Sequence, residues 1–130
     1  MPIDYTIDVA RRIVFATPRG TLTEDDLLRY QRDVWTRPEV RGFNELVDMS
    51  LIEHVEWGSA MKVRNVIGVA AEMDPPGTPS KFAIVAESEL HLKLAHMYQA
   101  FREAHPKNTR AVRIFTKVEP ALRWILEPGA

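Results

Sequence analysis

The sequence predicts an α/β fold with a mixed, mostly parallel five-stranded sheet and an N-terminal antiparallel hairpin. Two strand patterns follow each other at the N-terminus. Helical and strand patterns then alternate, which gives the order β-β-α-β-α-β-α-β-α. Because crossovers through helices are right-handed, the later strands should be parallel, with the first strand as an antiparallel edge. The length of 130 residues predicts one domain over residues 1–130.

The hairpin is predicted from residues 3–9 and 12–17. The first segment alternates apolar and polar residues with a period of two, which is typical of a half-buried strand. The second segment is β-branched and aromatic, as strands often are. Ala10 and Arg11 between them are not a favoured two-residue turn, so the turn geometry stays open. Pro18 ends the predicted pairing.

The first helix is predicted to begin at Thr23, whose hydroxyl can cap it. Three carboxylates follow directly and favour a helix N-terminus. Pro38 forces the helix to end, because the residue before a proline is pushed out of the α region. A third strand is predicted over residues 43–49. The stripe expected to face the core consists of Leu27, Leu28, Gln31, Val34 and Trp35.

Residues 50–58 are interpreted as a connection whose apolar residues fold back onto the core. A second helix is predicted over residues 59–73, with Val63, Val66, Ile67 and Ala70 on its buried side. Residues 75–79 hold three prolines and a glycine, which indicates a rigid loop.

The C-terminal half supplies the last two strands and two helices. Residues 82–86 form a nearly continuous apolar run, typical of a strand buried on both faces. Ser88 is the expected cap of a helix over 89–104, and residues 111–116 form the fifth strand. Pro120 suits the first position of a last helix. The predicted buried face of the helix over 89–104 consists of Leu90, Leu94, Met97 and Phe101.

Composition excludes several classes of protein. The absence of cysteine excludes disulfides, thiolate metal sites and cysteine nucleophiles. Seventeen Lys and Arg residues against eighteen Asp and Glu give a formal charge of -1, without the basic excess of a nucleic-acid binder. No apolar run approaches the ~20 residues of a membrane span, and the N-terminus lacks a signal-peptide pattern. We therefore expect a cytoplasmic protein, of bacterial origin.

Several short sequence motifs of the chain resemble those of the SpoIIAA-like family of the STAS group. Residues 20–25 match G-x-L-T-x-E/D, and residues 46–50 match a strand ending L-x-D-x-S. Residues 110–115 match R-x-V-x-V-F, and residues 119–125 match E-x-A-x-x-W-L/I. The resemblance spans residues 3–126. It implies a STAS-like fold, also likened to CRAL-TRIO lipid-transfer domains, and a role in contacts between proteins.

In STAS antagonists, a kinase phosphorylates a serine at the start of the helix after the D-x-S strand. A phosphate adds about -1.5 to -2 charges where backbone N–H groups converge. With Asp48 and Ser50 as anchors, the two serine positions of that family fall at Trp57 and Gly58. Ser59 stands one position further on. The switch serine is therefore not preserved in register, although a realigned loop would place Ser59 there.

The candidate interaction or ligand site consists of Asp48, Ser50, Trp57, Ser59 and Met61. The first two follow a predicted parallel strand, and ligands of open α/β sheets bind beyond the carboxyl ends of strands. Trp57 and Met61 flank the start of the second helix, where they would anchor a partner or line an apolar pocket. The alternatives are that Asp48 accepts hydrogen bonds from its own loop and that Trp57 packs into the core.

Other polar clusters are interpreted as structural or solvated. Glu53, His54 and Glu56 lack metal-ligand spacing. His91 and His96 would point about 140° apart on a helix, so they do not share a metal easily. A basic set in the last third is interpreted as a solvated face, with an anionic ligand or acidic partner as the alternative. This set is Arg102, Lys107, Arg110, Arg113, Lys117 and Arg123.

Three functions remain open from the sequence. The first is a non-enzymatic regulatory domain that binds an unknown protein partner, without a cofactor. The second is a carrier of a small apolar or lipid-like ligand. The third is an enzyme that uses Asp48 with a histidine, although no catalytic motif is present. A homodimer is also expected, since two-fold dimers are the commonest oligomers. The possible pocket liners are Trp35, Trp57, Met61, Met97 and Tyr98.

Overall fold

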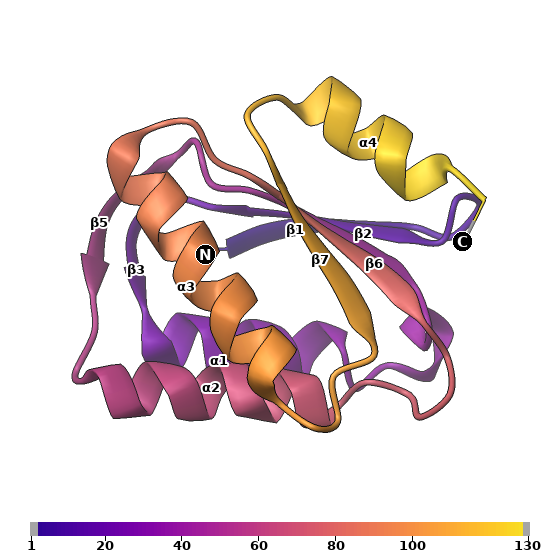
Figure 1. Ribbon diagram of the computed structural model, residues 1–130, viewed down its shortest axis with the longest axis horizontal. Coiled ribbons are helices and arrows are strands. Elements are labelled where there is room, and N and C mark those ends of the chain that lie inside the picture. The colour runs from indigo at the N-terminus through magenta and orange to yellow at the C-terminus, as the bar shows by residue number, and fades with distance from the viewer. Residues whose placement is uncertain (1–2, 129–130) are drawn as a thin grey trace.

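The computed structural model describes residues 3–128 and has the predicted mixed sheet (Figure 1). The five strands lie in the order β1-β2-β4-β6-β7, with β1 antiparallel to β2 and the other neighbours parallel. The predicted fold class and the N-terminal hairpin are therefore confirmed. The strands are β1 (Ile3–Asp8), β2 (Ile13–Pro18), β4 (Asn44–Asp48), β6 (Ser80–Val85) and β7 (Arg110–Phe115).

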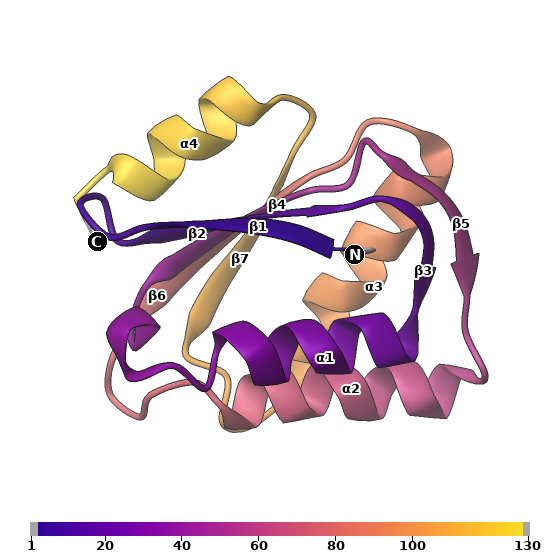
Figure 2. The same ribbon diagram turned by 180° about the vertical axis from the view of Figure 1, so that it is seen from behind.

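The helices lie in two layers on opposite sides of this sheet. Figures 1 and 2 show α1, α2 and α3 on one side and α4 on the other. Helix α2 packs between α1 and α3. Along residues 3–128, no helix combines the length and the hydropathy needed to cross a lipid bilayer. The helices are α1 (Glu24–Val34), α2 (Ala60–Glu72), α3 (Glu89–Ala104), α4 (Val118–Leu126) and the single 3₁₀ turn η1 (Pro38–Val40).

Two short strands form a second, parallel sheet that the sequence did not predict. They are β3 (Gly20–Thr23) and β5 (Ile52–Glu56), and the backbone N–H of Gly20 donates to the carbonyl of Leu51. Residues 52–56 of the predicted connection are therefore a strand, while Ile52, Val55 and Trp57 pack onto the core as expected. The apolar residues of β5, Ile52 and Val55, are three positions apart, so this segment lacks the period of two that identifies a strand.

Side-chain caps fix the starts of three helices where the sequence placed them. The Thr23 hydroxyl accepts from the Asp26 backbone N–H at 3.2 Å, and the Asp26 carboxylate accepts from the Thr23 N–H at 3.0 Å. This reciprocal pair is a capping box. Ser59 and Ser88 cap α2 and α3 in the same way, with one bond each. The last helix begins at Val118, so Pro120 takes its third position and not its first.

The buried face of α3 differs from the predicted one. Leu90 is 43% exposed, whereas His91, Ala95 and Arg102 are buried. The polar members of this face have partners in the fold. His91 Nε2 lies 2.8 Å from the carbonyl oxygen of Ile52, and Arg102 pairs with Asp74. Hydrophobic spacing alone therefore located the helix but not its inward side.

Candidate functional site

A cavity of about 340 Å³ lies between the sheet and the layer of α1, α2 and α3. Alternate residues of the central strands line its floor, namely Glu45 and Val47 from β4 and Phe82 and Ile84 from β6. Val47 is only half-buried, although its strand is in the middle of the sheet. The volume falls within the range of about 300–1,000 Å³ that small-molecule sites occupy.

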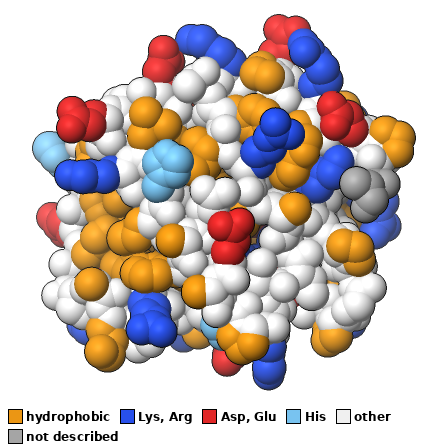
Figure 3. Space-filling model, viewed as in Figure 1, with side chains coloured by type: hydrophobic (Ala, Val, Ile, Leu, Met, Phe, Trp, Pro, Cys, Tyr) orange, Lys and Arg blue, Asp and Glu red, His pale blue; other side chains and the backbone are white. Residues whose placement is uncertain are grey.

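The walls of the cavity are mostly apolar and run along α2. Trp57 lies just before the first residue of this helix, and Met73 and Asp74 follow its last residue. The 13 residues of α2 span about 20 Å, so the lining residues mark two well-separated ends. Figure 3 shows hydrophobic side chains gathered in the area that α3, α2 and β5 border in Figure 1.

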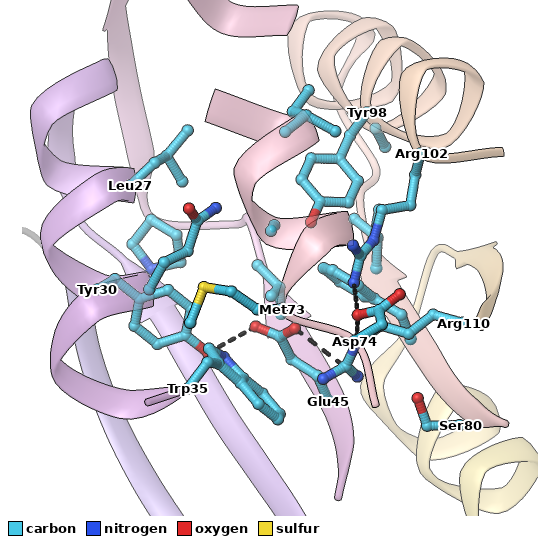
Figure 4. Close-up of a pocket in the computed structure, with 18 of the residues that line it drawn as sticks. Leu27, Tyr30, Trp35, Glu45, Met73, Asp74, Ser80, Tyr98, Arg102 and Arg110 are labelled. Atoms are coloured by element: carbon cyan, nitrogen blue, oxygen red, sulfur yellow. Dashed lines mark hydrogen bonds and ion pairs between the residues drawn. The ribbon is translucent and has the colours of Figure 1, made fainter. Parts of the chain in front are cut away.

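The end of the cavity near Asp74 is polar and charged (Figure 4). Glu45, Asp74, Arg102 and Arg110 are each at most 7% exposed. Arg102 Nη2 donates to Asp74 Oδ1 at 2.8 Å, and the Thr109 backbone N–H donates to Asp74 Oδ2 at 2.9 Å. Both oxygens of the Asp74 carboxylate are therefore occupied.

Arg110 has longer contacts with the same group of residues. Its Nε lies 3.5 Å from Asp74 Oδ1, and its Nη1 lies 4.0 Å from Glu45 Oε1. Charge-assisted N–H···O bonds are usually about 2.7–2.9 Å long. The guanidinium also lies over the Trp35 ring, 4.2 Å from the ring centroid, which holds its plane by a cation–π contact.

Tyrosines from two helices complete the polar end. The Tyr30 hydroxyl donates to Glu45 Oε2 at 2.5 Å, and burial together with the Glu45 charge raises the pKa of Tyr30 well above its ordinary value. Figure 4 shows the Tyr98 hydroxyl directed into the cavity. Burial raises the pKa of Tyr98 to about 12. Both hydroxyls thus stay protonated at neutral pH and act as uncharged polar groups.

Several buried polar atoms around the charged end have no hydrogen-bond partner within residues 3–128. The donors are Arg102 Nε, Arg102 Nη1, Arg110 Nη1 and Trp35 Nε1, and the acceptors are Gln31 Oε1 and Thr109 Oγ1. A buried polar group left unpaired costs about 1–3 kcal/mol. Each of these atoms is closed to solvent in this structure, so its hydrogen-bonding capacity is unused there.

The interpretation of Arg102 and Arg110 as part of a solvated basic face was wrong. The other four members of that set, Lys107, Arg113, Lys117 and Arg123, are exposed. Arg110 shares the inward face of β7 with Val112 because the two are two residues apart. Arg102 lies seven residues after the buried Ala95, on the same side of α3. Strand parity and helix spacing agree with both burials, but neither pattern identifies the buried partner Asp74.

The sequence-predicted site residues lie at the opposite end of the fold from the charged group. The Asp48 carboxylate accepts from the Ser50 backbone N–H at 3.0 Å, and the Ser59 hydroxyl accepts from the Lys62 N–H at 3.1 Å. Of the five, Trp57 alone lines the cavity. Met61 is 69% exposed.

Other sequence-predicted candidates also have defined places. Four of the five suggested pocket liners, Trp35, Trp57, Met97 and Tyr98, line the cavity, and Met61 does not. The described part of the chain contains no group of three or more His, Asp or Glu side chains arranged to hold a metal ion. His91, the buried histidine of α3, contacts a backbone carbonyl.

Comparison with solved structures identifies the fold. The chain is similar to an uncharacterised protein of the DUF3478 family from Shewanella loihica, whose structure has a SpoIIAA-like fold. The TM-score is 0.63 with 16% sequence identity, over 95% of this chain and 93% of the other. No family model and no curated protein matches the sequence. The chain therefore has the SpoIIAA-like fold that the resemblance of its sequence motifs implied.

Proposed function

We propose that this protein is a non-catalytic binding domain that holds a small, mostly apolar molecule with a polar end. The observation that carries the proposal is the cavity itself, about 340 Å³ in volume, with Trp57 and Met73 near the two ends of α2. Apolar walls supply affinity through burial of hydrophobic surface, and a few polar groups at one place orient the ligand.

The charged end supports binding more than catalysis. Its two carboxylates and two guanidinium groups contact one another, and Asp74 already accepts two short hydrogen bonds. General base catalysis needs a carboxylate within reach of a substrate proton, but both Asp74 oxygens are committed to the protein. The polar cluster is therefore suited to recognise one end of a ligand.

Substitution of Ala70 with phenylalanine tests the proposal, because Ala70 lies on α2 and lines the cavity. The new ring should fill part of the cavity and weaken binding of the uncharged fluorescent probe N-phenyl-naphthylamine about tenfold or more, which corresponds to about 1.4 kcal/mol of lost contact. A fluorescence titration of the purified protein measures this affinity.

The matched control is Val69→Phe, at the preceding position of the same helix. Val69 is 39% exposed and is not part of the cavity lining. The control variant should bind the probe like the unchanged protein, and thermal unfolding should show that both variants fold. Failure of the unchanged protein to bind the probe, or equal binding by Ala70→Phe, would contradict the proposal.

Regulation through a protein partner is the second candidate function. The observation that favours it is the exposed Met61 side chain beside the Ser59 cap, at the position that the STAS resemblance links to partner binding. A photo-cross-linking residue at Met61 should yield one adduct of defined mass in a lysate of the source cells. The same residue at the exposed Val9 should not.

Three results limit this second candidate. Equal labelling from both positions, or none from Met61, would contradict it. An adduct with the mass of two chains would instead support the expected homodimer, which light scattering would then have to show as a doubled mass. The cytoplasmic location stays a prediction from the sequence.

A further inference from the structure

We propose that the polar end of the cavity selects a ligand whose head group is an uncharged oxygen acceptor, above all a carboxamide. This inference rests on the proposed binding function and names the ligand class. A carboxylate or an ammonium head group should bind less well. Two features of the site lead to this choice, namely its balance of charge and its excess of unused hydrogen-bond donors.

The charges of the polar end already balance. Glu45 and Asp74 supply two negative charges, and Arg102 and Arg110 supply two positive charges, all buried within one connected group. A carboxylate placed there would add a third negative charge close to two others in a medium of low dielectric constant. An ammonium group would face the two guanidinium groups. Either ion would lose its hydration without a free countercharge.

The unused hydrogen-bonding groups require acceptors in particular. Three guanidinium nitrogens have no partner among the described residues. The Trp35 Nε1–H also makes no hydrogen bond of full geometry, although it lies close enough to the Tyr30 hydroxyl to act on the pKa of that group. A carbonyl oxygen can accept two such bonds without bringing a charge. The unpaired Gln31 Oε1 is an acceptor, so it can accept a hydrogen bond from an N–H of the ligand. A carboxamide offers both functions in one planar group.

Arg110 is the donor best prepared for this contact. The Trp35 and Phe82 rings lie 4.2 and 5.9 Å from its guanidinium carbon, so its plane is held from the aromatic side. Its carboxylate neighbours remain at 3.5 and 4.0 Å. Arg110 Nη1 is closed to solvent in this structure, so a shift of neighbouring side chains would bring a ligand oxygen to it, and no existing short hydrogen bond of this nitrogen would be lost.

The test compares three ligands with the same chain, namely octanamide, octanoate and octylamine, at neutral pH. Each is titrated against the protein loaded with N-phenyl-naphthylamine, and displacement of the probe reports its affinity. We expect octanamide to displace the probe about tenfold more effectively than either charged analogue. Octanoate binding as tightly as octanamide, or equal binding by all three, would overturn the inference while the proposed function stands.

A matched pair of tryptophan variants locates the head group. Trp35→Phe keeps a ring beneath Arg110 but removes the Nε1–H, and should reduce octanamide affinity several-fold more than it reduces probe affinity. Trp57→Phe, at the other end of α2, should leave the preference for octanamide unchanged. A preference lost in Trp57→Phe and kept in Trp35→Phe would overturn the inference. Failure of the probe itself to bind would instead refute the proposed function.

Discussion

Replacement of Asp74 with asparagine is expected to lower the free energy of unfolding by about 3–5 kcal/mol, the usual cost of breaking a buried ion pair. The asparagine fills the same space, so the loss reports charge and not volume. Arg102 Nη2 would lose the negative charge of its partner at 2.8 Å, and Arg110 Nε would lose the carboxylate at 3.5 Å. Two buried guanidinium groups would then share the single charge of Glu45. Urea unfolding followed by circular dichroism measures the change.

An exposed ion pair provides the matched control for this prediction. Lys117 and Glu87 lie 3.3 Å apart with side chains that are mostly exposed. Glu87→Gln should cause no measurable loss, because water screens such pairs and solvates the remaining charge. A loss in Asp74→Asn as small as that in Glu87→Gln would contradict the account of the network.

A double-mutant cycle separates the pair from its surroundings. Arg102→Met alone should destabilise the protein strongly, since Asp74 would lose its shortest side-chain partner. The double variant Asp74→Leu with Arg102→Met should lose less free energy of unfolding than the sum of the losses in Asp74→Leu alone and Arg102→Met alone. The reason is that no uncompensated charge remains between the two positions. Additive losses would show that the two side chains do not act as a pair.

The same cluster shows why the sequence predicted the framework but not the charged end of the cavity. Apolar periodicity located all five strands of the main sheet, because each alternates or runs apolar over five or six residues. Burial of Arg102 depends on Asp74, which lies 28 positions away. No local sequence pattern identifies so distant an ion-pair partner. Charged residues without a partner are mostly exposed, so the sequence alone predicted exposure for Arg102.

Strand polarity led the sequence analysis to the end of the sheet opposite the charged end of the cavity. Asp48 and Ser50 were chosen because ligands of parallel sheets usually lie beyond the carboxyl ends of strands. Ser80 and Arg110 are instead the first residues of β6 and β7, so the charged group lies at the amino ends. The rule for open α/β sheets points beyond the carboxyl ends of the strands, whereas the cavity runs beneath α2 along the face of the sheet.

Replacement of Ile125 with alanine is expected to lower the free energy of unfolding by about 2–5 kcal/mol, since it removes a buried side chain and leaves a void. Ile125 is 3% exposed and packs with Ile13, Leu46 and Val85 between α4 and the sheet. The neighbouring Leu126, 49% exposed, is the control, and Leu126→Ala should change stability by at most about 0.5 kcal/mol. Thermal and urea unfolding of both variants measure the difference.

The Ile125→Ala variant should still bind a ligand in the cavity. It therefore tests whether packing between α4 and the sheet is independent of the cavity on the other face of the sheet. Leu46 points toward α4, whereas Glu45 and Val47 on either side of it line the cavity, because successive residues of a strand face opposite sides. Affinity for N-phenyl-naphthylamine should therefore stay within about twofold while the variant is folded, because nothing that touches the probe has changed. A large loss of affinity would mean that packing beneath α4 sets the shape of the cavity across the sheet.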